Sequence, residues 1–388
     1  MTTAALPMPR AVAFWRRIPV WRLVFYAIMS AALYATYLRL FHGLGSATNL
    51  SNEFPWGIWI GFDVLCGVGL AAGGFTLVAI VHIFHIERYK PVLRPAILTA
   101  FLGYVLVVVA LMLDLGRPDR IWHPLVMWNP RSVMFEVAWC VMLYNTVLAL
   151  EFAPALFERM QWRRPLRIVQ AISAPLVIVG VILSTLHQSS LGSLYLIVPS
   201  KLHPLWYSPL LPLLFYVSAI SVGLAMTIFE SWHSAKAFGK QLEWPLLMSL
   251  GRLLAVVLGV FLVMRFMDLS RRHVLGAMLE PRPEVYLFYL EIALMAIPVV
   301  VLFSGAVAER PRLLYFCAVS AILGFITHRL NVSVTGIQAM TGASYVPRWT
   351  EIAITLGLIA AGFAIFRTAA KYLPVFEHPV EAEVREST

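Results

Sequence analysis

Ten long apolar segments, separated by short charged loops, constrain the fold of this 388-residue chain more than any other feature. A helix of roughly 20 apolar residues is needed to cross about 30 Å of hydrocarbon. The segments that are long enough lie at residues 20–42, 56–84, 93–115, 131–157, 166–188, 206–231, 245–269, 284–307, 312–331 and 349–371. The sequence therefore predicts an all-α polytopic membrane protein with about ten transmembrane helices.

Other classes of protein fit this composition poorly. Only 13% of the residues are charged, whereas a soluble domain carries about 25%. A transmembrane β-barrel is excluded because its strands contain about ten residues of alternating polarity. The net charge of +10 does not indicate a nucleic-acid partner, because the basic residues lie in short loops. We expect the lipid bilayer to be the main surroundings of the chain.

The distribution of basic residues predicts the orientation of the chain. With ten helices both termini lie on one side, and that side holds 19 Lys and Arg residues while the other holds nine. The positive-inside rule then places both termini in the cytoplasm of a bacterium, with the helices in the inner membrane. The first apolar segment is too long for the hydrophobic region of a signal peptide, so we expect it to be retained as a helix.

A shift of 154 residues aligns the sequence with itself. It places Val68-Gly69-Leu70-Ala71 on Val222-Gly223-Leu224-Ala225 and Asp114-Leu115-Gly116-Arg117 on Asp268-Leu269-Ser270-Arg271. Because the shift spans four helices, both copies cross the membrane in the same direction, which predicts two parallel four-helix bundles. The predicted domains are residues 1–42 (cytoplasmic N-terminus and flanking first helix), 55–190 (first bundle), 205–332 (second bundle) and 349–388 (flanking tenth helix and cytoplasmic tail).

Ionisable residues inside a membrane are costly and are functional candidates by default. Most of them lie toward the predicted periplasmic face: Asp63, Asp114, Glu136 and His187 in the first copy, and Arg265, Asp268, Glu291, His328 and Arg329 in the second, with Glu351 opening the tenth helix. Glu151 and Glu230 lie toward the cytoplasm. A transporter site is expected near the midplane, so this outward displacement favours a different function.

Simple ion pairing explains some of these residues as well as chemistry does. Asp114 and Asp268 lie at helix ends beside arginines, and His328 with Arg329 has the option of pairing with a neighbouring carboxylate. Asp63 is different, because Val217 occupies its place in the second copy. The asymmetry between the copies predicts that the site lies in the first bundle, around Asp63, Glu136 and His187.

An apolar pocket lined by histidine and carboxylates suits a lipophilic substrate that exchanges protons, such as a quinone. Quinone reduction takes two electrons and two protons, and His187 and Glu136 have the chemistry to pass protons. Asp114, Trp59 and Tyr104 complete the candidate quinone site. Glu151 and Glu230 would continue a proton route to the cytoplasm, although pairing with nearby basic loops explains them equally well.

The sequence favours no metal centre in this chain. The three cysteines, Cys66, Cys140 and Cys317, lie inside predicted helices and are too few for an iron–sulfur cluster. His187 and His328 lie at similar depth and leave one haem possible, but they end different repeats, which is not the pairing of a two-haem cytochrome b. Without haem, electrons must arrive from a partner protein.

Several longer stretches resemble a known family. They are Phe54-Pro55-Trp56-Gly57-Ile58-Trp59-Ile60-Gly61-Phe62-Asp63, Ala149-Leu150-Glu151-Phe152-Ala153-Pro154-Ala155-Leu156-Phe157-Glu158 and Leu186-His187-Gln188-Ser189-Ser190-Leu191-Gly192-Ser193. They are similar to the NrfD/PsrC-type integral membrane subunits, and the closest likeness is to the HybB branch, the membrane subunit of a periplasm-facing nickel–iron hydrogenase.

The resemblance implies a haem-free subunit that passes electrons from a periplasmic ferredoxin-like iron–sulfur subunit, and through it from a catalytic hydrogenase subunit, to menaquinone or ubiquinone. It implies that Asp63, Glu136 and His187 match positions around the quinone, and that Glu151 and Glu230 match acidic positions associated with proton conduction. The loop Arg117-Pro118-Asp119-Arg120 departs from the family pattern. The alternatives are a subunit of a molybdenum oxidoreductase of the polysulfide, nitrite or tetrathionate type, a secondary transporter or a passive anchor.

Overall fold

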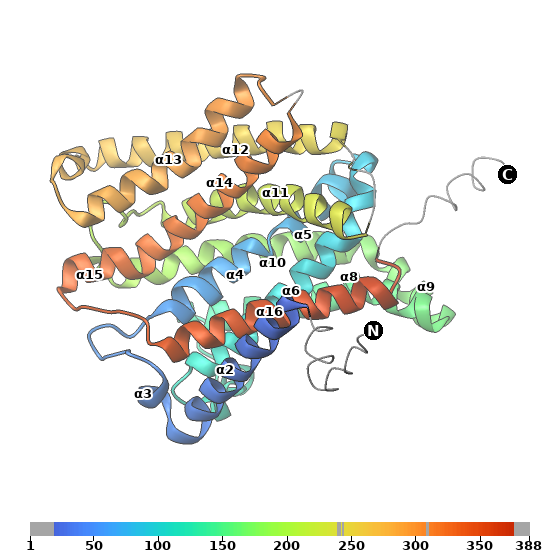
Figure 1. Ribbon diagram of the computed structural model, residues 1–388, viewed down its shortest axis with the longest axis horizontal. Coiled ribbons are helices and arrows are strands. Elements are labelled where there is room, and N and C mark those ends of the chain that lie inside the picture. The colour runs from blue at the N-terminus through green and yellow to red at the C-terminus, as the bar shows by residue number, and fades with distance from the viewer. Residues whose placement is uncertain (1–18, 239–241, 243, 308–309, 376–388) are drawn as a thin grey trace, which may run out of the picture.

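The computed structural model describes residues 19–238, 242, 244–307 and 310–375 (Figure 1); the predicted cytoplasmic segments at 1–18 and 376–388 lie outside the described residues. This part of the chain contains helices and no strand, and ten of its helices are long and apolar enough to cross a membrane. The prediction of an all-α polytopic membrane protein is therefore confirmed.

The ten candidate spans follow the predicted segments closely. They are α2 (Val20–His42), a composite helix at Trp59–Ile83, α6 (Lys90–Asp114), α8 (Val133–Met160), α10 (Ser173–Ser193) continued by η5 (Leu194–Ile197), α11 (Leu211–Phe238), α12 (Trp244–Arg271), α13 (Pro283–Phe303), α14 (Pro311–Leu330) continued by η8 (Asn331–Thr335) and α15 (Gly336–Thr341), and α16 (Trp349–Tyr372). The short helices α3 (Leu44–Ala47), α7 (His123–Val126) and α9 (Arg163–Ala171) lie between spans.

The predicted boundaries of the fifth, sixth and ninth spans were wrong by several residues: the fifth ends at Ile197 instead of residue 188, and the sixth is Leu211–Ala237 instead of 206–231. The fifth span begins at Ser173 instead of residue 166, because α9 forms a separate short helix before it. Arg163, Arg164 and Arg167 make α9 too polar to enter the membrane with α10. The ninth span continues ten residues past its predicted end at 331, through the π-helical turn η8 and into α15.

The composite helix at Trp59–Ile83 is the most buried of the candidate spans. It consists of η1 (Trp59–Val64), α4 (Leu65–Leu70), α5 (Gly73–Val78) and η2 (Ala79–Ile83), where η1 and η2 are π-helical turns. A π-helical turn inserts one extra residue per turn and is common at functional sites. The candidate residue Asp63 lies in η1.

Neighbouring spans pack in a regular order. In Figure 1, α12 and α13 lie at one side of the molecule and α2 with α16 at the other, with α4, α5 and α11 between them. In the first predicted bundle α6 packs against α5 and α8, and α10 against α8 and α5; in the second, α11 packs against α12 and α14, and α13 against both of these. The parallel-bundle arrangement and the predicted domain limits stay predictions.

Glycines let the composite helix approach α11 closely. A Cβ atom on Gly223 would lie 2.8 Å from the carbonyl carbon of Ala72 and 2.9 Å from the backbone nitrogen of Gly73. Small residues allow this backbone-to-backbone packing between membrane helices. Gly69, the glycine aligned with Gly223 in the first copy, is also crowded, but by the ring of Phe325 and not by backbone atoms.

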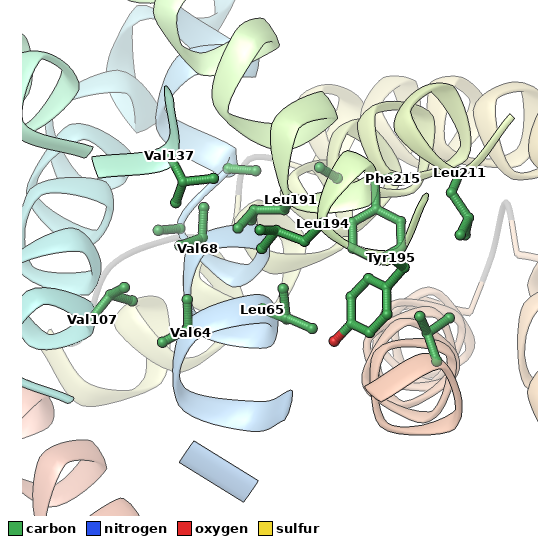
Figure 2. Packing of buried hydrophobic residues seen from close by; sticks show 14 of the residues in the cluster. Val64, Leu65, Val68, Val107, Val137, Leu191, Leu194, Tyr195, Leu211 and Phe215 are labelled. Atoms are coloured by element: carbon green, nitrogen blue, oxygen red, sulfur yellow. The ribbon is translucent and has the colours of Figure 1, made fainter. Parts of the chain in front are cut away.

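The larger core cluster surrounds η1 and α4. Figure 2 shows side chains of this composite helix against those from the end of α10, from η5 and from the start of α11; the labelled residues are Val64, Leu65, Val68, Val107, Val137, Leu191, Leu194, Tyr195, Leu211 and Phe215. A separate small cluster of Ala35, Trp59, Leu113, Ala353 and Ile354 joins α2 and α16 to this core. The two flanking helices are thus packed directly against the helix that carries Asp63.

Candidate functional site

A row of polar side chains runs along the interface of α8 and α10. At one end, near the predicted periplasmic face, the Ser190 hydroxyl donates a short hydrogen bond to the Glu136 carboxylate. Ser132 caps the start of α8, where its hydroxyl accepts a hydrogen bond from the Phe135 N–H (3.4 Å). The two helices are antiparallel neighbours, so residues three or four apart on each of them form facing rows.

His187 lies one turn before Ser190 and is completely buried. Its ring centroid is 5.6 Å from that of Tyr104 on α6, and Tyr104 in turn contacts Tyr144 on α8 edge to face at 4.7 Å. The Ser184 hydroxyl approaches both tyrosine hydroxyls. Three helices therefore bring an imidazole and two phenols into one buried group.

The polar atoms of this group are largely without partners. Both ring nitrogens of His187 and the hydroxyls of Tyr104, Tyr144 and Ser184 are buried, and no hydrogen bond to another described residue satisfies them. Buried polar atoms normally bind protein groups, ordered water or a ligand. The arrangement therefore provides several adjacent hydrogen-bonding atoms that a ligand or a chain of water molecules would satisfy.

The row ends at Glu151, toward the predicted cytoplasmic face. Glu136 and Glu151 are 15 residues apart on α8, which corresponds to about 22 Å along the helix axis. The Glu151 Oε1 atom is buried without a partner, and a Cβ on Gly180 of α10 would lie 3.4 Å from it. We call the set Glu136, Ser190, His187, Tyr104, Tyr144, Ser184 and Glu151 the polar row.

Glu136 lies at the start of its helix. The fourth span, α8, begins at Val133 instead of residue 131, so Glu136 is in its first turn. Its side chain is exposed on the surface of the chain, whereas His187 is completely buried. Glu136 thus stands at the outer end of the polar row, and the deep position belongs to His187.

Asp63 faces a different neighbour from the one expected. The Thr355 hydroxyl of α16 donates a hydrogen bond to Asp63 Oδ2 (2.7 Å), and both side chains are buried. Among the described residues, neither Glu136 nor His187 forms a hydrogen bond with Asp63. The structure therefore places Asp63 against the flanking tenth span.

Glu351, one turn before Thr355, fixes the start of the composite helix. Its carboxylate accepts hydrogen bonds from the Tyr345 hydroxyl (2.6 Å), the Arg348 N–H (2.8 Å) and the Asn49 N–H (3.0 Å). Its backbone carbonyl accepts a hydrogen bond from the Trp59 indole (3.2 Å). Residues 351 and 355 of α16 therefore hold residues 59 and 63 of η1, both predicted site residues.

Tyr345 extends this contact to the backbone before η1. Its hydroxyl oxygen accepts a hydrogen bond from the Ile58 N–H (2.8 Å) while the hydroxyl proton is donated to Glu351. Burial, followed by the hydrogen bond to Glu351, raises the pKa of Tyr345. The phenol therefore stays protonated and remains a donor. We call Glu351, Tyr345, Thr355, Trp59 and Asp63 the tenth-span cluster.

Asp114 lies beside this cluster at the end of α6. The guanidinium of Arg39 on α2 donates hydrogen bonds to the carbonyls of Leu113 and Leu115, which flank Asp114. Arg39 is buried, and its charge acts on Asp114. An arginine does accompany this aspartate, as the sequence suggested, but it comes from the first span and not from the adjacent loop.

The second copy holds a buried ionic network in which Glu291 has several partners, whereas Arg265 Nε and Nη1 and His328 Nε2 have none among the described residues. The Glu291 carboxylate contacts His328 Nδ1 (2.8 Å) and accepts hydrogen bonds from the Trp206 indole (2.9 Å) and the Asn331 amide (2.8 Å). Arg265 donates to the Leu205 carbonyl (2.7 Å). The expected pairing of His328 with a carboxylate is present in this arrangement. Both carboxylate oxygens of Glu291 have hydrogen-bond partners, whereas the ring nitrogens of His187 in the polar row have none.

Two further charged groups complete the second copy. Asp268 forms an ion pair with Arg272 (2.7 Å), as expected for a helix-end aspartate. Arg329 does not pair with a carboxylate: its guanidinium donates to the Phe215 carbonyl (3.0 Å) and the Ser218 hydroxyl (3.1 Å), and it stacks over the Phe215 ring at 3.4 Å. Glu230 lies on α11 close to Thr99 of α6, with a buried Oε1 that lacks a partner.

The described residues do not fit a bis-histidine haem. No cluster of three or more His, Cys, Asp or Glu side chains suited to a metal ion occurs among them. His328 is tied to Glu291 through Nδ1, and the rings of Phe215 and Phe261 contact it at 6.0 and 5.4 Å. The rings that pack around His187 are phenols, with no second imidazole among them.

The sequence identified the charged and aromatic residues of the two groups better than their hydroxyl residues. Trp59, Asp63, Tyr104, His187 and Glu151 were identified as candidates, and each lies in one of the two groups defined above. Tyr144, Ser190, Tyr345 and Thr355 were missed, because a single hydroxyl residue in an apolar helix carries no distinct signal. Glu351 was noticed only as an acidic residue at the start of the tenth span.

Comparison with known proteins agrees with the resemblance seen in the motifs. The family model described as polysulphide reductase, NrfD, matches residues 46–341. The chain is 36% identical over 344 residues to the probable Ni/Fe-hydrogenase 2 b-type cytochrome subunit of Escherichia coli, covering 87% of each chain. It is 28% identical over 400 residues to the integral membrane subunit of menaquinone reductase of Nitratidesulfovibrio vulgaris, covering 94% of this chain and 93% of that one. The chain belongs to the NrfD family of integral membrane subunits.

Proposed function

We propose that the chain is the quinone-reactive, haem-free membrane subunit of a nickel–iron hydrogenase complex in the bacterial inner membrane. The observation that carries this proposal is the buried group around His187, whose imidazole and two neighbouring phenols offer hydrogen-bonding atoms that the protein itself leaves unused. The names of two relatives, a hydrogenase subunit and a menaquinone reductase subunit, support the reaction class.

The polar row has the chemistry that quinone reduction requires. The substrate, menaquinone or ubiquinone, takes up two electrons and two protons to become the quinol. His187 and Tyr104 are placed to donate hydrogen bonds to a ring oxygen, because their free atoms lie in one buried group. Ser190 and Glu136 stand at the outer end of the row, where they would bind or transfer a proton at the second oxygen.

The electrons must come from another subunit in this proposal. We infer that a ferredoxin-like iron–sulfur subunit docks at the predicted periplasmic end, close to Glu136, and that it receives electrons from a catalytic hydrogenase subunit. The outer end of the polar row is also where the chain is exposed at Glu136. A short distance between the donor and the substrate favours fast electron transfer.

The carboxylates nearer the cytoplasm have a proposed part in proton supply. Glu151 terminates the polar row with an unpartnered oxygen, and Glu230 has one as well. Water molecules hydrogen-bonded along the row would connect Glu151 with His187. Asp63 and Trp59 form the other wall in this proposal, and α16 determines their position through Thr355 and Glu351.

Two substitutions test the site directly. In membranes that contain the complete complex, we expect Glu136→Gln and His187→Ala to lower hydrogen-dependent reduction of a water-soluble quinone analogue by at least the 10²-fold typical of losing a general acid–base group. Dye reduction by the hydrogenase subunit should remain. The control is Glu87→Gln, which removes an exposed carboxyl that forms an ion pair with Lys90 and lies outside both groups. Normal quinone reduction in both site variants would refute the assignment.

A spectrum tests the haem-free part of the proposal. The Escherichia coli relative carries the name b-type cytochrome subunit, whereas in the described part of the chain neither His187 nor His328 contacts a second imidazole. We expect the reduced-minus-oxidised absorption spectrum of the purified chain to lack an α-band. A stoichiometric α-band would require a haem and would remove this part of the proposal.

The catalytic partner is tested separately from the quinone site. Mass spectrometry of subunits that co-purify with the chain from its native membrane should identify a nickel–iron hydrogenase and an iron–sulfur protein. A molybdenum oxidoreductase in their place would establish the alternative assignment, with the same quinone chemistry in the membrane. Purification of the chain without any redox partner would favour a transporter.

A further inference from the structure

A hollow outside the quinone site lies between α11 and α14. Its volume is about 590 Å³, and its walls are formed by Trp232, Arg310, Pro311, Arg312, Leu313 and Phe316. In Figure 1, α11 ends and α14 begins at the end of the molecule where α2 begins and α16 ends, which is the predicted cytoplasmic end. Binding pockets for small molecules and lipids commonly have volumes of about 300–1,000 Å³.

The walls of the hollow combine an apolar surface with aromatic rings. Phe316 is 64% exposed, and Trp232 packs against Tyr315 with ring centroids 5.3 Å apart. Tyr315 is held in turn by Phe229 and by a hydrogen bond with His233 (3.1 Å). Aromatic side chains of this kind are enriched at the boundary between hydrocarbon and headgroups. The packing fixes Trp232 as a rigid wall.

Arg310 and Arg312 line the hollow with the aliphatic parts of their side chains, because its surface is almost entirely apolar, and among the described residues their guanidinium groups have no acidic partner. Arg310 and Arg312 are exposed, and neither forms an ion pair with a carboxylate of the described residues. The first turn of α14 also contains no acidic residue, so the positive end of the helix dipole is not neutralised there. The exposed Arg117 and the half-buried Arg94, in contrast, do have carboxylate partners.

From this combination we propose that the hollow binds an anionic phospholipid of the cytoplasmic leaflet. Arg310 and Arg312 would bind the phosphate, since guanidinium groups form paired hydrogen bonds with phosphate oxygens. The apolar face of Trp232 and Phe316 would contact the upper part of an acyl chain. Basic pockets between membrane helices on the cytoplasmic side suit such headgroups.

A lipid fits the hollow better than a soluble anion does. A free phosphate would use the two arginines but would leave Trp232, Leu313 and Phe316 exposed. A zwitterionic lipid would bring its own positive charge next to the guanidinium groups. The proposal is independent of the quinone reaction, because the hollow shares no residue with the polar row or the tenth-span cluster.

Native mass spectrometry of the purified chain tests the proposal. The probes are phosphatidylglycerol, phosphatidylcholine with the same acyl chains, and inorganic phosphate, each added to delipidated protein in detergent. We expect one phosphatidylglycerol to bind preferentially, and the double substitution Arg310→Gln/Arg312→Gln to weaken its binding by about 30-fold. Substituting Trp232→Gln should weaken the binding of phosphatidylglycerol, and inorganic phosphate alone should still not bind.

The matched control is Arg164→Gln/Arg167→Gln, which removes two exposed arginines of α9 at the same end of the molecule. This variant should bind phosphatidylglycerol at the hollow as the unchanged chain does. Equal loss in the control would show general charge attraction and overturn the proposal. Equal binding of phosphatidylcholine would overturn it. Binding of inorganic phosphate that excludes the lipid would overturn it as well. Unchanged elution from a sizing column verifies that each variant is folded.

Discussion

The contact between Glu351 and Tyr345 permits a quantitative prediction about the tenth-span cluster. The two substitutions are Tyr345→Phe and Glu351→Gln, made singly and together. The first removes a hydroxyl that donates to Glu351 (2.6 Å) and accepts from the Ile58 N–H (2.8 Å). The second removes the negative charge that accepts three hydrogen bonds. All of these contacts connect α16 to the start of the composite helix.

The expected magnitude follows from the number and type of bonds. A hydrogen bond to a charged group contributes about 1.5–3 kcal/mol, and a buried donor left without a partner costs about 1–3 kcal/mol. Tyr345→Phe removes the hydrogen bond to the charged Glu351 and leaves the Ile58 N–H without its acceptor. We therefore expect a loss of about 2–4 kcal/mol in the free energy of unfolding. Couplings measured between membrane-protein side chains reach about 1.7 kcal/mol, so we expect a pairwise coupling of about 1–1.5 kcal/mol.

Unfolding in mixed SDS micelles provides the assay. Cys66, Cys140 and Cys317 are all buried, so their reaction with a thiol-reactive dye reports unfolding in each variant. The control is Tyr286→Phe, because Tyr286 is 64% exposed and its hydroxyl makes no hydrogen bond to another described residue. If the coupling is below about 0.5 kcal/mol, the normal error of additivity, or if Tyr345→Phe behaves like Tyr286→Phe, then the cluster does not fix the helix start as argued.

Three further predictions address packing, the site and topology. Gly223→Ala should cost about 1–3 kcal/mol in the same assay, because its Cβ would meet backbone atoms of the composite helix; Gly116→Ala, with open space around it, should not. Thr355→Val keeps the side-chain shape but removes the donor to Asp63, so hydrogen-dependent quinone reduction should fall by about tenfold, with the hydrogenase dye assay unchanged. In a cysteine-free chain, Ser51→Cys should react with an impermeant reagent in spheroplasts and Arg164→Cys only after permeabilisation; the reverse pattern would invert the predicted orientation.

The positions of the spans could be predicted because length and apolarity alone determine them. Eight of the segments begin within a few residues of their predicted limits, and α2 begins and ends where expected. The ninth span was harder, since η8 and α15 continue it through Asn331 and Ser333, which are polar but buried. Their hydrogen bonds to Glu291 and to a backbone carbonyl explain why polar residues are tolerated there.

The neighbours of Asp63 could not be predicted from the sequence. Thr355 is 292 residues away in the chain, and the internal repeat directed attention to helices of the same copy. The tenth span lies outside both copies, so no repeat-based argument reaches it. Local pattern identifies which residues are costly to bury, whereas the identity of the facing helix depends on how the whole set of spans packs.

The separation of the two groups changes what the asymmetry between the copies means. Asp63 was interpreted as one member of a single cluster with Glu136 and His187, because all three lie at the outer end of the first copy. In the structure, Asp63 belongs to an arrangement in which α16 supplies the hydrogen-bond donor, while His187 belongs to the α6–α8–α10 interface. The second copy has Val217 in place of Asp63, and the flanking tenth span packs against the composite helix of the first copy. A buried carboxylate at this position has its hydrogen-bond donor only in the copy that has α16 beside it. The absence of the acid in the other copy follows from the position of this one flanking helix.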